Sequence, residues 1–478
     1  MDKNEKWSGV WWIPNAKLTS LNGLLIYKKG KTLKLKINGE FEKSPFGERK
    51  NELVNIILGE DKKRNKITLV NCYAVKSYGA NNFLDKYNKN IVVEYFVQFI
   101  LVGHHILNRN GLQFNNIKFS IDKLNSWFHR SEFTINYKIQ DTSVNINRVQ
   151  EKDVFLQLSE NEQLKIESRV NFLAKEEKYF EYKVRQDTFI QFISSIDLSI
   201  NDIVSKIQIF NNFLILLSSS NAKPTKVYVT SDFLLKKKIQ QPVQIQLYFL
   251  DDSIINKQKK FGYLNFFLTH NKISEEFPEV IKNWFNQYSQ YSDPLGLFFD
   301  QISYKQKFSY NTFLNQMQSL ESLHAFKIEK LKGENDRLKA IPDFEFKRKI
   351  AEIMQKLSKE DKDWLKGSSV DCSNRIYLQK RLEDILSKTS NPTMNRFIGD
   401  VEVFIKQIKQ SRNYYTHRKD RQSHVLHGAK LRWVSMKLTL VYSYWVLIDL
   451  QIDKSKLENA LKDFIYHNYN FVPEGTIE

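Results

Sequence analysis

The sequence predicts an α+β protein, because its two parts follow different periodicities. From residue 7 to about 270, apolar and polar residues alternate, as in half-buried strands. Beyond about residue 300, apolar residues recur every three or four positions, as in amphipathic helices. The stretch QYSQYSDPLGLFF, residues 287–299, carries Pro and Gly between the two patterns. We therefore expect an antiparallel, sandwich- or barrel-like β-rich domain over residues 1–295 and an all-helical bundle over residues 296–478.

The strands of the first domain can be placed individually. TLKLKINGEF alternates Leu33, Leu35 and Ile37 with lysines and then reaches an Asn38-Gly39 turn. The same alternation, in segments rich in β-branched and aromatic residues, occupies residues 66–70, 91–102, 133–140, 154–159, 178–184, 225–230 and 243–250. Helical insertions are expected at about 80–90 and 200–217. Short strands with polar turns between them are typical of sandwiches and barrels.

The helices of the second domain show as apolar stripes. One stripe consists of Leu314, Met317, Glu321, His324 and Ile328, and a later one of Val401, Phe404, Ile405 and Ile408. Further stripes run through residues 346–357, 378–385 and 431–448, with Gly or Pro between them. The pattern predicts an up-and-down bundle of four or five helices, with residues 451–478 as a short tail.

Composition limits the partners and the compartment. The 478 residues contain 73 Lys and Arg against 54 Asp and Glu, a net charge of +19. This balance favours an anionic partner, nucleic acid ahead of membrane, although a compositional bias toward Lys, Asn, Ile, Phe and Tyr explains it equally well. The sequence has only two cysteines, shows no signal-peptide pattern and contains no apolar run of roughly 20 residues. We therefore expect a cytoplasmic protein without a membrane partner.

Motifs for cofactors and metals are missing from the sequence. It contains no phosphate-binding glycine loop, dinucleotide fingerprint, nucleophile elbow or zinc-ligand spacing. The pairs His104-His105 and His424/His427 have no acidic or cysteine ligands at useful spacing. We therefore expect no cofactor and no metal.

The candidate site is SRNYYTHRKDRQ, residues 411–422. Four residues after Ile408, the apolar stripe arrives at Arg412, so a guanidinium turns toward packing. A buried arginine needs a carboxylate, an anionic ligand or an interface. Glu321, on the inward stripe of the first helix, is the candidate carboxylate, and a purely structural Glu321–Arg412 pair is one alternative.

His417 follows Arg412 by five residues, which places the two about 140° apart on one helix. They can share a site if the helix bends or ends near residues 414–420, or if two copies of the bundle face each other. The pairs Arg418/His424 and Arg421/His427 have similar spacing and compete with it.

Charge and aromatic side chains surround these residues. Substrate contacts are expected from Tyr414, Tyr415, Arg418, Lys419 and Arg421, because basic groups bind phosphates and aromatic rings stack on bases. A solvated basic turn is the alternative. Histidine can transfer protons near neutral pH, and arginine can stabilise a pentavalent phosphorane. RNA supplies its own 2′-OH nucleophile, so these groups suffice for cleavage to 2′,3′-cyclic phosphate and 5′-OH ends without a metal.

Three segments resemble one family. IKQSRNYYTH resembles the R-N-x-x-x-H signature of HEPN ribonucleases, and FLNQMQSLESLHAF resembles the first helix of the ApeA-like HEPN group, in which a glutamate precedes a histidine by three. WSGVWWIPNAKLTSLNGLLIYKKGKTLKLKINGEF is similar to the start of the ApeA N-terminal domain, with its tryptophans, G-x-L and G-x-F. The resemblance extends over essentially the whole chain.

The resemblance implies a bacterial anti-phage effector that acts by abortive infection. It implies a HEPN homodimer with a composite RNase site, in which Arg412 and His417 are catalytic, Asn413 orients them and Glu321 positions Arg412. The expected substrate is tRNA or another host or phage RNA, and the N-terminal domain is expected to bind a phage-derived trigger. The alternatives are a non-catalytic RNA-binding or scaffold protein that uses the same basic site, and a purely structural dimer.

Overall fold

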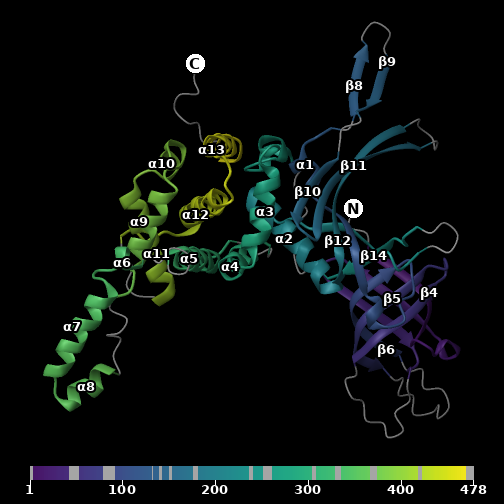
Figure 1. Ribbon diagram of the computed structural model, residues 1–478, viewed down its shortest axis with the longest axis horizontal. Helices are drawn as coiled ribbons and strands as arrows, with labels where there is room; N and C mark the ends of the chain where they lie inside the picture. The colour runs from purple at the N-terminus through teal and green to yellow at the C-terminus, as the bar shows by residue number, and fades with distance from the viewer. Residues whose placement is uncertain are drawn as a thin grey trace. The chain divides into compact units, whose positions relative to one another are not determined.

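The computed structural model describes residues 4–41, 53–78, 92–131, 133–138, 143–149, 153–175, 181–235, 241–250, 261–303, 308–328, 335–366, 374–417 and 423–469. The chain divides into two compact units (Figure 1), one of Met1–Leu214 and Asn221–Phe261 and the other of Ile215–Ser220 and Gly262–Glu478. The first is a predominantly antiparallel β structure and the second is helical, which confirms the predicted α+β class.

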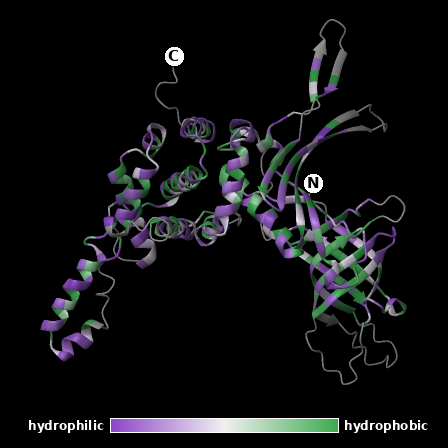
Figure 2. Ribbon diagram, in the orientation of Figure 1, coloured by the Kyte–Doolittle hydropathy of each residue, from purple (hydrophilic) through white to green (hydrophobic). Residues whose placement is uncertain are grey.

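Six strands of the first unit close on themselves. They are β1 (Glu5–Trp12), β2 (Leu21–Lys28), β3 (Thr32–Asn38), β4 (Leu53–Asp61), β5 (Lys66–Tyr78) and β6 (Val92–Val102), in the order β6-β3-β2-β1-β4-β5, and β5 pairs again with β6. Hydrophobic and hydrophilic residues are interleaved along these strands (Figure 2). Leu33, Leu35 and Ile37 point inward as predicted and share a buried core with Trp7 and Trp11. Period-two alternation produces this result because successive side chains of a strand face opposite sides.

An open set of strands continues from the closed sheet. The edge of β6 that pairs with β3 along Val92–Phe96 pairs with β14 (Ile245–Phe249) along Phe99–Val102. From β14 the order is β13 (Pro224–Thr230), β7 (Gln113–Ile121), β12 (Glu181–Ser199), β11 (Glu162–Lys175) and β10 (Val154–Ser159). A separate hairpin consists of β8 (Phe133–Lys138) and β9 (Ser143–Arg148).

Helix α2 (Ile200–Ser218) confirms the helical insertion predicted at 200–217, whereas the one predicted at 80–90 lies outside the described residues. Its Phe210 ring packs edge-on against Phe119 of β7 and Trp127 of α1 (Leu124–Phe128). Short 3-10 helices occupy Lys17–Thr19, Arg109–Gly111, Tyr263–Asn265 and His270–Ile273.

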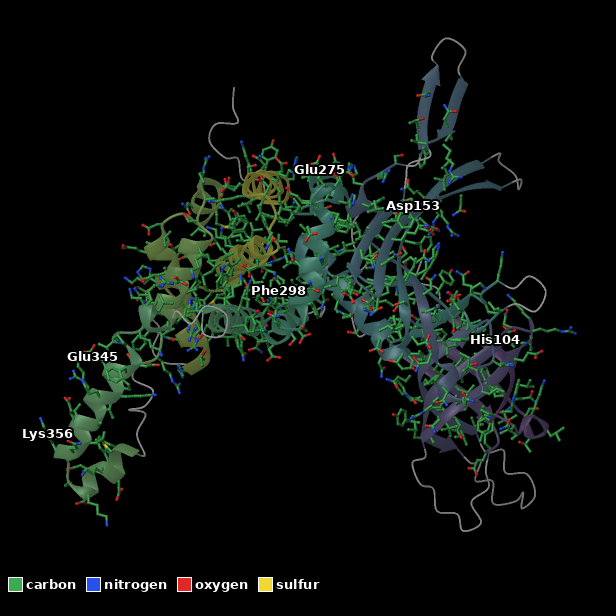
Figure 3. The ribbon with its side chains drawn as sticks, viewed as in Figure 1. His104, Asp153, Glu275, Phe298, Glu345 and Lys356 are labelled. Carbon is green, nitrogen blue, oxygen red and sulfur yellow. The ribbon has the colours of Figure 1, made fainter. Side chains whose placement is uncertain are left out.

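The second unit is built around α12 (Gly428–Asp449), which is buried on all sides from Leu440 to Leu447. Its other helices are α3 (Phe277–Tyr288), α4 (Ser292–Ser303), α5 (Tyr310–Ala325), α6 (Asn335–Leu338), α7 (Asp343–Lys356), α8 (Lys359–Lys366), α9 (Leu378–Lys388), α10 (Pro392–Ile398), α11 (Val401–His417) and α13 (Lys454–Tyr469). Phe298 of α4, labelled in Figure 3, stacks on Tyr442 of α12 with ring centroids 4.1 Å apart. Apolar packing of this kind holds the helices that carry the candidate site.

Several details of the helical prediction are wrong. The stretch 287–299, whose Pro294 and Gly296 were expected to break regular structure, is mostly helical. Pro294 is tolerated because it lies in the first turn of α4, where its missing N–H breaks no helical hydrogen bond. Residues 454–469 form a helix with a buried apolar face and not a tail. Val401, Ile353 and Ile448 are exposed, since spacing predicts a face but not how much of it a neighbour covers.

Candidate functional site

Helix α11 positions the predicted catalytic residues. The Asp400 carboxylate accepts a hydrogen bond from Val403 N at 2.9 Å at the start of the helix. Phe404, Ile405 and Ile408 are buried, and α11 packs against α5 and α9 (Figure 1). This stripe fixes the rotation of the helix, and with it the directions of the residues of its last two turns.

Arg412 meets Glu321 of α5, as the sequence predicted. Its Nε lies 3.7 Å from Glu321 Oε1, and the two side chains are 32% and 28% exposed. The contact is therefore a half-exposed ion pair, longer than a hydrogen bond, and contributes at most about 1 kcal/mol. The guanidinium is held near the bundle and keeps access to solvent, so an anion can approach it.

His417 is the last residue of α11 and is exposed. Since the helix is continuous from Arg412 to His417, the two side chains leave it about 140° apart. Asn413 is four residues before His417 and is also exposed, so these two are neighbours on one face. Both residues lie in the one helix Val401–His417, and residues 418–420 of the interval in which a bend or an end was predicted lie outside the described residues.

The segment before α12 folds back along α11. His424 N donates to Gln410 Oε1 at 2.9 Å, and Leu426 N donates to the buried Ser411 Oγ at 2.9 Å. Tyr415 OH donates to Leu426 O at 3.0 Å. These three hydrogen bonds hold residues 424–427 beside the last turns of α11.

The two predicted aromatic contacts differ in their surroundings. Tyr415 stacks on Tyr310 of α5, with centroids 5.2 Å apart and planes 3° apart, and its hydroxyl also lies 2.7 Å from His427 Nδ1. The half-buried Tyr414 ring packs edge-on against Tyr415 and His427. Tyr415 therefore contributes to the packing of the bundle, and Tyr414 is the better candidate of the two for contact with a substrate. Arg418, Lys419 and Arg421 lie outside the described residues.

Sequence reasoning missed a buried polar network next to Glu321. His324, fully buried and three residues further along α5, is bonded through Nε2 to Asp384 Oδ2 at 3.1 Å and through Nδ1 to Arg381 at 3.0 Å. Arginine can only donate, so Nδ1 accepts and Nε2–H donates to Asp384. Burial, and then the positive charge of Arg381, lower the pKa of His324 from 6.5 to about 4, so the ring is neutral at neutral pH.

Asp384 connects this network to two more cations. Arg337 of α6 donates to its Oδ1 at 2.7 Å, and Lys388 Nζ lies 3.5 Å from Oδ2. Burial raises the pKa of Asp384, but Arg337 and Lys388 together lower it below its usual range. The signal in the sequence was His324 on an inward stripe, opposite a helix that carries Arg381 and Asp384 three residues apart.

Two family models match the chain. The ApeA N-terminal domain 1 model matches residues 6–284, more than half of the chain, and the Apea-like HEPN model matches residues 314–456. The chain belongs to the ApeA-like HEPN proteins. The searches of curated proteins and of solved structures found no match.

The HEPN match includes Glu321, His324 and the whole of α11, and it supports an HEPN-type nuclease in anti-phage defence. Within the described residues, no group of three or more His, Cys, Asp and Glu side chains is arranged to hold a metal ion. No helix in the same ranges combines the length and apolar character needed to cross a membrane.

Proposed function

We propose that this ApeA-like HEPN protein is a metal-independent endoribonuclease that acts by abortive infection. The observation that carries the proposal is the state of Arg412. It is held near the bundle by a half-exposed ion pair with Glu321, in the same two turns of α11 as the exposed His417. A guanidinium that is held in position and remains accessible to solvent can bind a phosphate. It can also stabilise the negative charge that develops on the phosphate during the reaction.

The proposed reaction is transesterification of RNA. The 2′-oxygen attacks the adjacent phosphorus, the bond to the 5′-oxygen breaks, and the products end in a 2′,3′-cyclic phosphate and a 5′-OH. Arg412 stabilises the phosphorane, His417 transfers a proton, and Asn413, on the same face as His417, orients it. Glu321 positions Arg412 and leaves its outer donors for the substrate.

The angle between Arg412 and His417 supports a site built by two copies of the bundle. On one straight helix the two side chains leave in directions about 140° apart, so a single phosphate does not reach both easily. Two α11 helices that face each other place Arg412 of one copy near His417 of the other. We propose a homodimer through the bundle for this reason.

The proposed substrate is tRNA, host or phage, in the bacterial cytoplasm. A net charge of +19 suits a polyanionic partner, and Tyr414 at the end of α11 can stack on an unpaired base. Arg418, Lys419 and Arg421 follow directly in the sequence and are assigned to phosphate contacts. The β-rich part, residues 1–295, is proposed to bind a phage-derived trigger and to control the bundle of residues 296–478.

The decisive test separates cleavage from binding. Arg412→Ala and His417→Ala are compared with wild type and with Lys406→Ala, which removes an exposed charge earlier on α11. Both site variants are expected to lose cleavage of a bacterial tRNA pool, while Lys406→Ala cleaves normally. If cleavage survives both changes, the catalytic assignment is wrong. If wild type and variants all bind tRNA and none of them cuts it, the protein is an RNA-binding scaffold.

A further inference from the structure

The twelve-stranded sheet of the first unit has one edge that the described residues leave open. At one end the sheet closes, because β5 pairs with β6. At the other end β10 pairs with β11, and no further strand of the described structure follows it. Every second residue of an edge strand points its backbone N–H and C=O away from the sheet, where they can pair with another strand.

Elsewhere in the same sheet the fold covers such an edge. β12 extends beyond its pairing with β7, and there Asn125 of α1 takes the place of a neighbouring strand. Its Nδ2 donates to Gln186 O at 2.8 Å, and its Oδ1 accepts from Thr188 N at 2.7 Å. In the described part of the chain, no side chain makes bonds of this kind to the outer edge of Val154–Gln157.

The sequence of β10 gives this edge little protection. Natural edge strands carry lysine, proline or inward-pointing charges that discourage pairing with other chains. The strand VFLQLS contains none of these. A register shift between Gln157 and Ser159 interrupts the pairing with β11, but it leaves the stretch Val154–Gln157 regular. An uncharged, regular edge promotes aggregation unless the working protein covers it.

Both faces of β10 present apolar groups next to the open edge. Leu156 lies opposite Leu164 of β11, and both side chains are buried. Phe155 points to the other face, opposite Lys165, whose Nζ lies 5.2 Å from the centre of its ring. The Phe155 side chain is nevertheless 62% exposed. A strand that pairs with this edge therefore needs apolar side chains on both of its faces.

These features favour a second copy of the chain as the occupant of the edge. A transient partner leaves the edge exposed in the resting protein, whereas a second copy is always present. β10 is also complementary to itself in an antiparallel pair centred on Phe155. Val154 of each copy then lies opposite Leu156 of the other on the buried face, and the two Phe155 rings meet on the exposed face. A two-fold interface requires such self-complementarity.

We propose that β10 pairs antiparallel with β10 of a second copy, so that the sheet continues across a two-fold axis. This inference deepens the homodimer proposed above and rests on it. Four residues per strand bury too little surface to hold a dimer alone, so the contact between the helical bundles supplies the rest of the interface. Both contacts are isologous, and they close one dimer when they share the two-fold axis.

The test is a disulfide across the proposed axis, in full-length protein that carries Cys372→Ser and keeps the fully buried Cys72. In Phe155→Cys the two new residues face each other, with Cβ atoms about 4.5–5.5 Å apart. In the matched control Gln157→Cys, on the same face of β10, they lie about 14 Å apart along the strands. At micromolar protein, mild oxidation should link Phe155→Cys roughly 100-fold faster than Gln157→Cys, because paired thiols react within one complex.

The outcomes distinguish this inference from the proposed homodimer. Equal rates in the two cysteine variants, or no link in Phe155→Cys, refute the pairing of the strands. Sedimentation of the wild type shows whether the dimer fails with it. A dimeric wild type without the Phe155→Cys link refutes the strand pairing alone, and a monomeric wild type refutes both.

Hydrogen exchange, resolved to single residues by mass spectrometry, tests the pairing without a new disulfide. In the full-length wild type, the outward amides of Val154–Gln157 should be as protected as those bonded to β11. Phe155→Lys, which places a charge on the edge, should make the outward set exchange fast. Phe233→Lys changes another exposed phenylalanine of the same unit and should leave these amides protected. Fast exchange of the outward amides in the wild type would overturn the proposal, as would their protection in a protein that sediments as a monomer.

Discussion

The buried His324 should make the stability of the helical unit depend on pH. Its folded-state pKa is about 4, against 6.5 in an exposed histidine. Between these values the unfolded chain binds a proton that the folded protein does not, so stability falls as pH falls from about 6.5 toward 4. The proton-binding polynomials of His324 in the unfolded and folded states give the size of this effect. Between pH 7.5 and pH 5 the free energy of unfolding falls by about 2 kcal/mol.

His324→Gln isolates this effect. The Gln amide can donate to Asp384 and accept from Arg381, as the neutral imidazole does, but it does not titrate in this range. Urea unfolding followed by circular dichroism at the two pH values gives the difference for each protein. Between pH 7.5 and pH 5, the free energy of unfolding should fall by about 2 kcal/mol more in the wild type than in His324→Gln. The control His467→Gln, which changes an exposed histidine, should show the same fall as the wild type. Equal losses in the wild type and His324→Gln would refute the neutral, buried assignment.

Three further outcomes follow from other contacts in the structure. Asp384→Ala should lower the free energy of unfolding by about 3–5 kcal/mol, since a buried carboxylate that pairs with Arg337 is removed, and urea unfolding checks it. Glu321→Ala should change the melting temperature little, because its ion pair is half-exposed, yet slow tRNA cleavage; unchanged cleavage would remove Glu321 from the site. Gly59→Ala should destabilise the closed sheet by about 1–3 kcal/mol, because a Cβ there would lie 2.2 Å from the Trp11 ring, and thermal unfolding followed by tryptophan fluorescence measures it.

Local rules predicted the elements better than they predicted the packing. Strand alternation placed Leu33, Leu35 and Ile37 correctly, because facing is a property of the strand itself. Helical spacing could not say that Val401 is exposed, since that depends on which neighbouring helix covers it. Closure of the six strands through β5 and β6 is likewise a pairing between distant segments, for which the sequence carries no local signal.

The same division holds for the candidate site. Arg412 and Glu321 could be matched because each is a charge on an apolar stripe, and such charges need partners. The placement of residues 424–427 against α11 could not be predicted, because it depends on side-chain hydrogen bonds from Gln410, Ser411 and Tyr415. Tyr415 reads as an aromatic substrate contact in the sequence, and its stacking on Tyr310 appears only in three dimensions.

The histidines of the helical unit differ in burial, and this decides which of them can do chemistry. His324 is fully buried, hydrogen-bonded on both nitrogens and titrates near pH 4, so it cannot exchange protons with a substrate at neutral pH. Its hydrogen bonds to Asp384 and Arg381 can hold α5 against α9 and so fix the rotation of α5 about its axis. Glu321, one turn earlier on α5, is then directed toward Arg412. His417, by contrast, is exposed in the last described turn of α11. His324 therefore fits a structural role that holds α5 and α9 together, and the proposed function assigns proton transfer to the exposed His417.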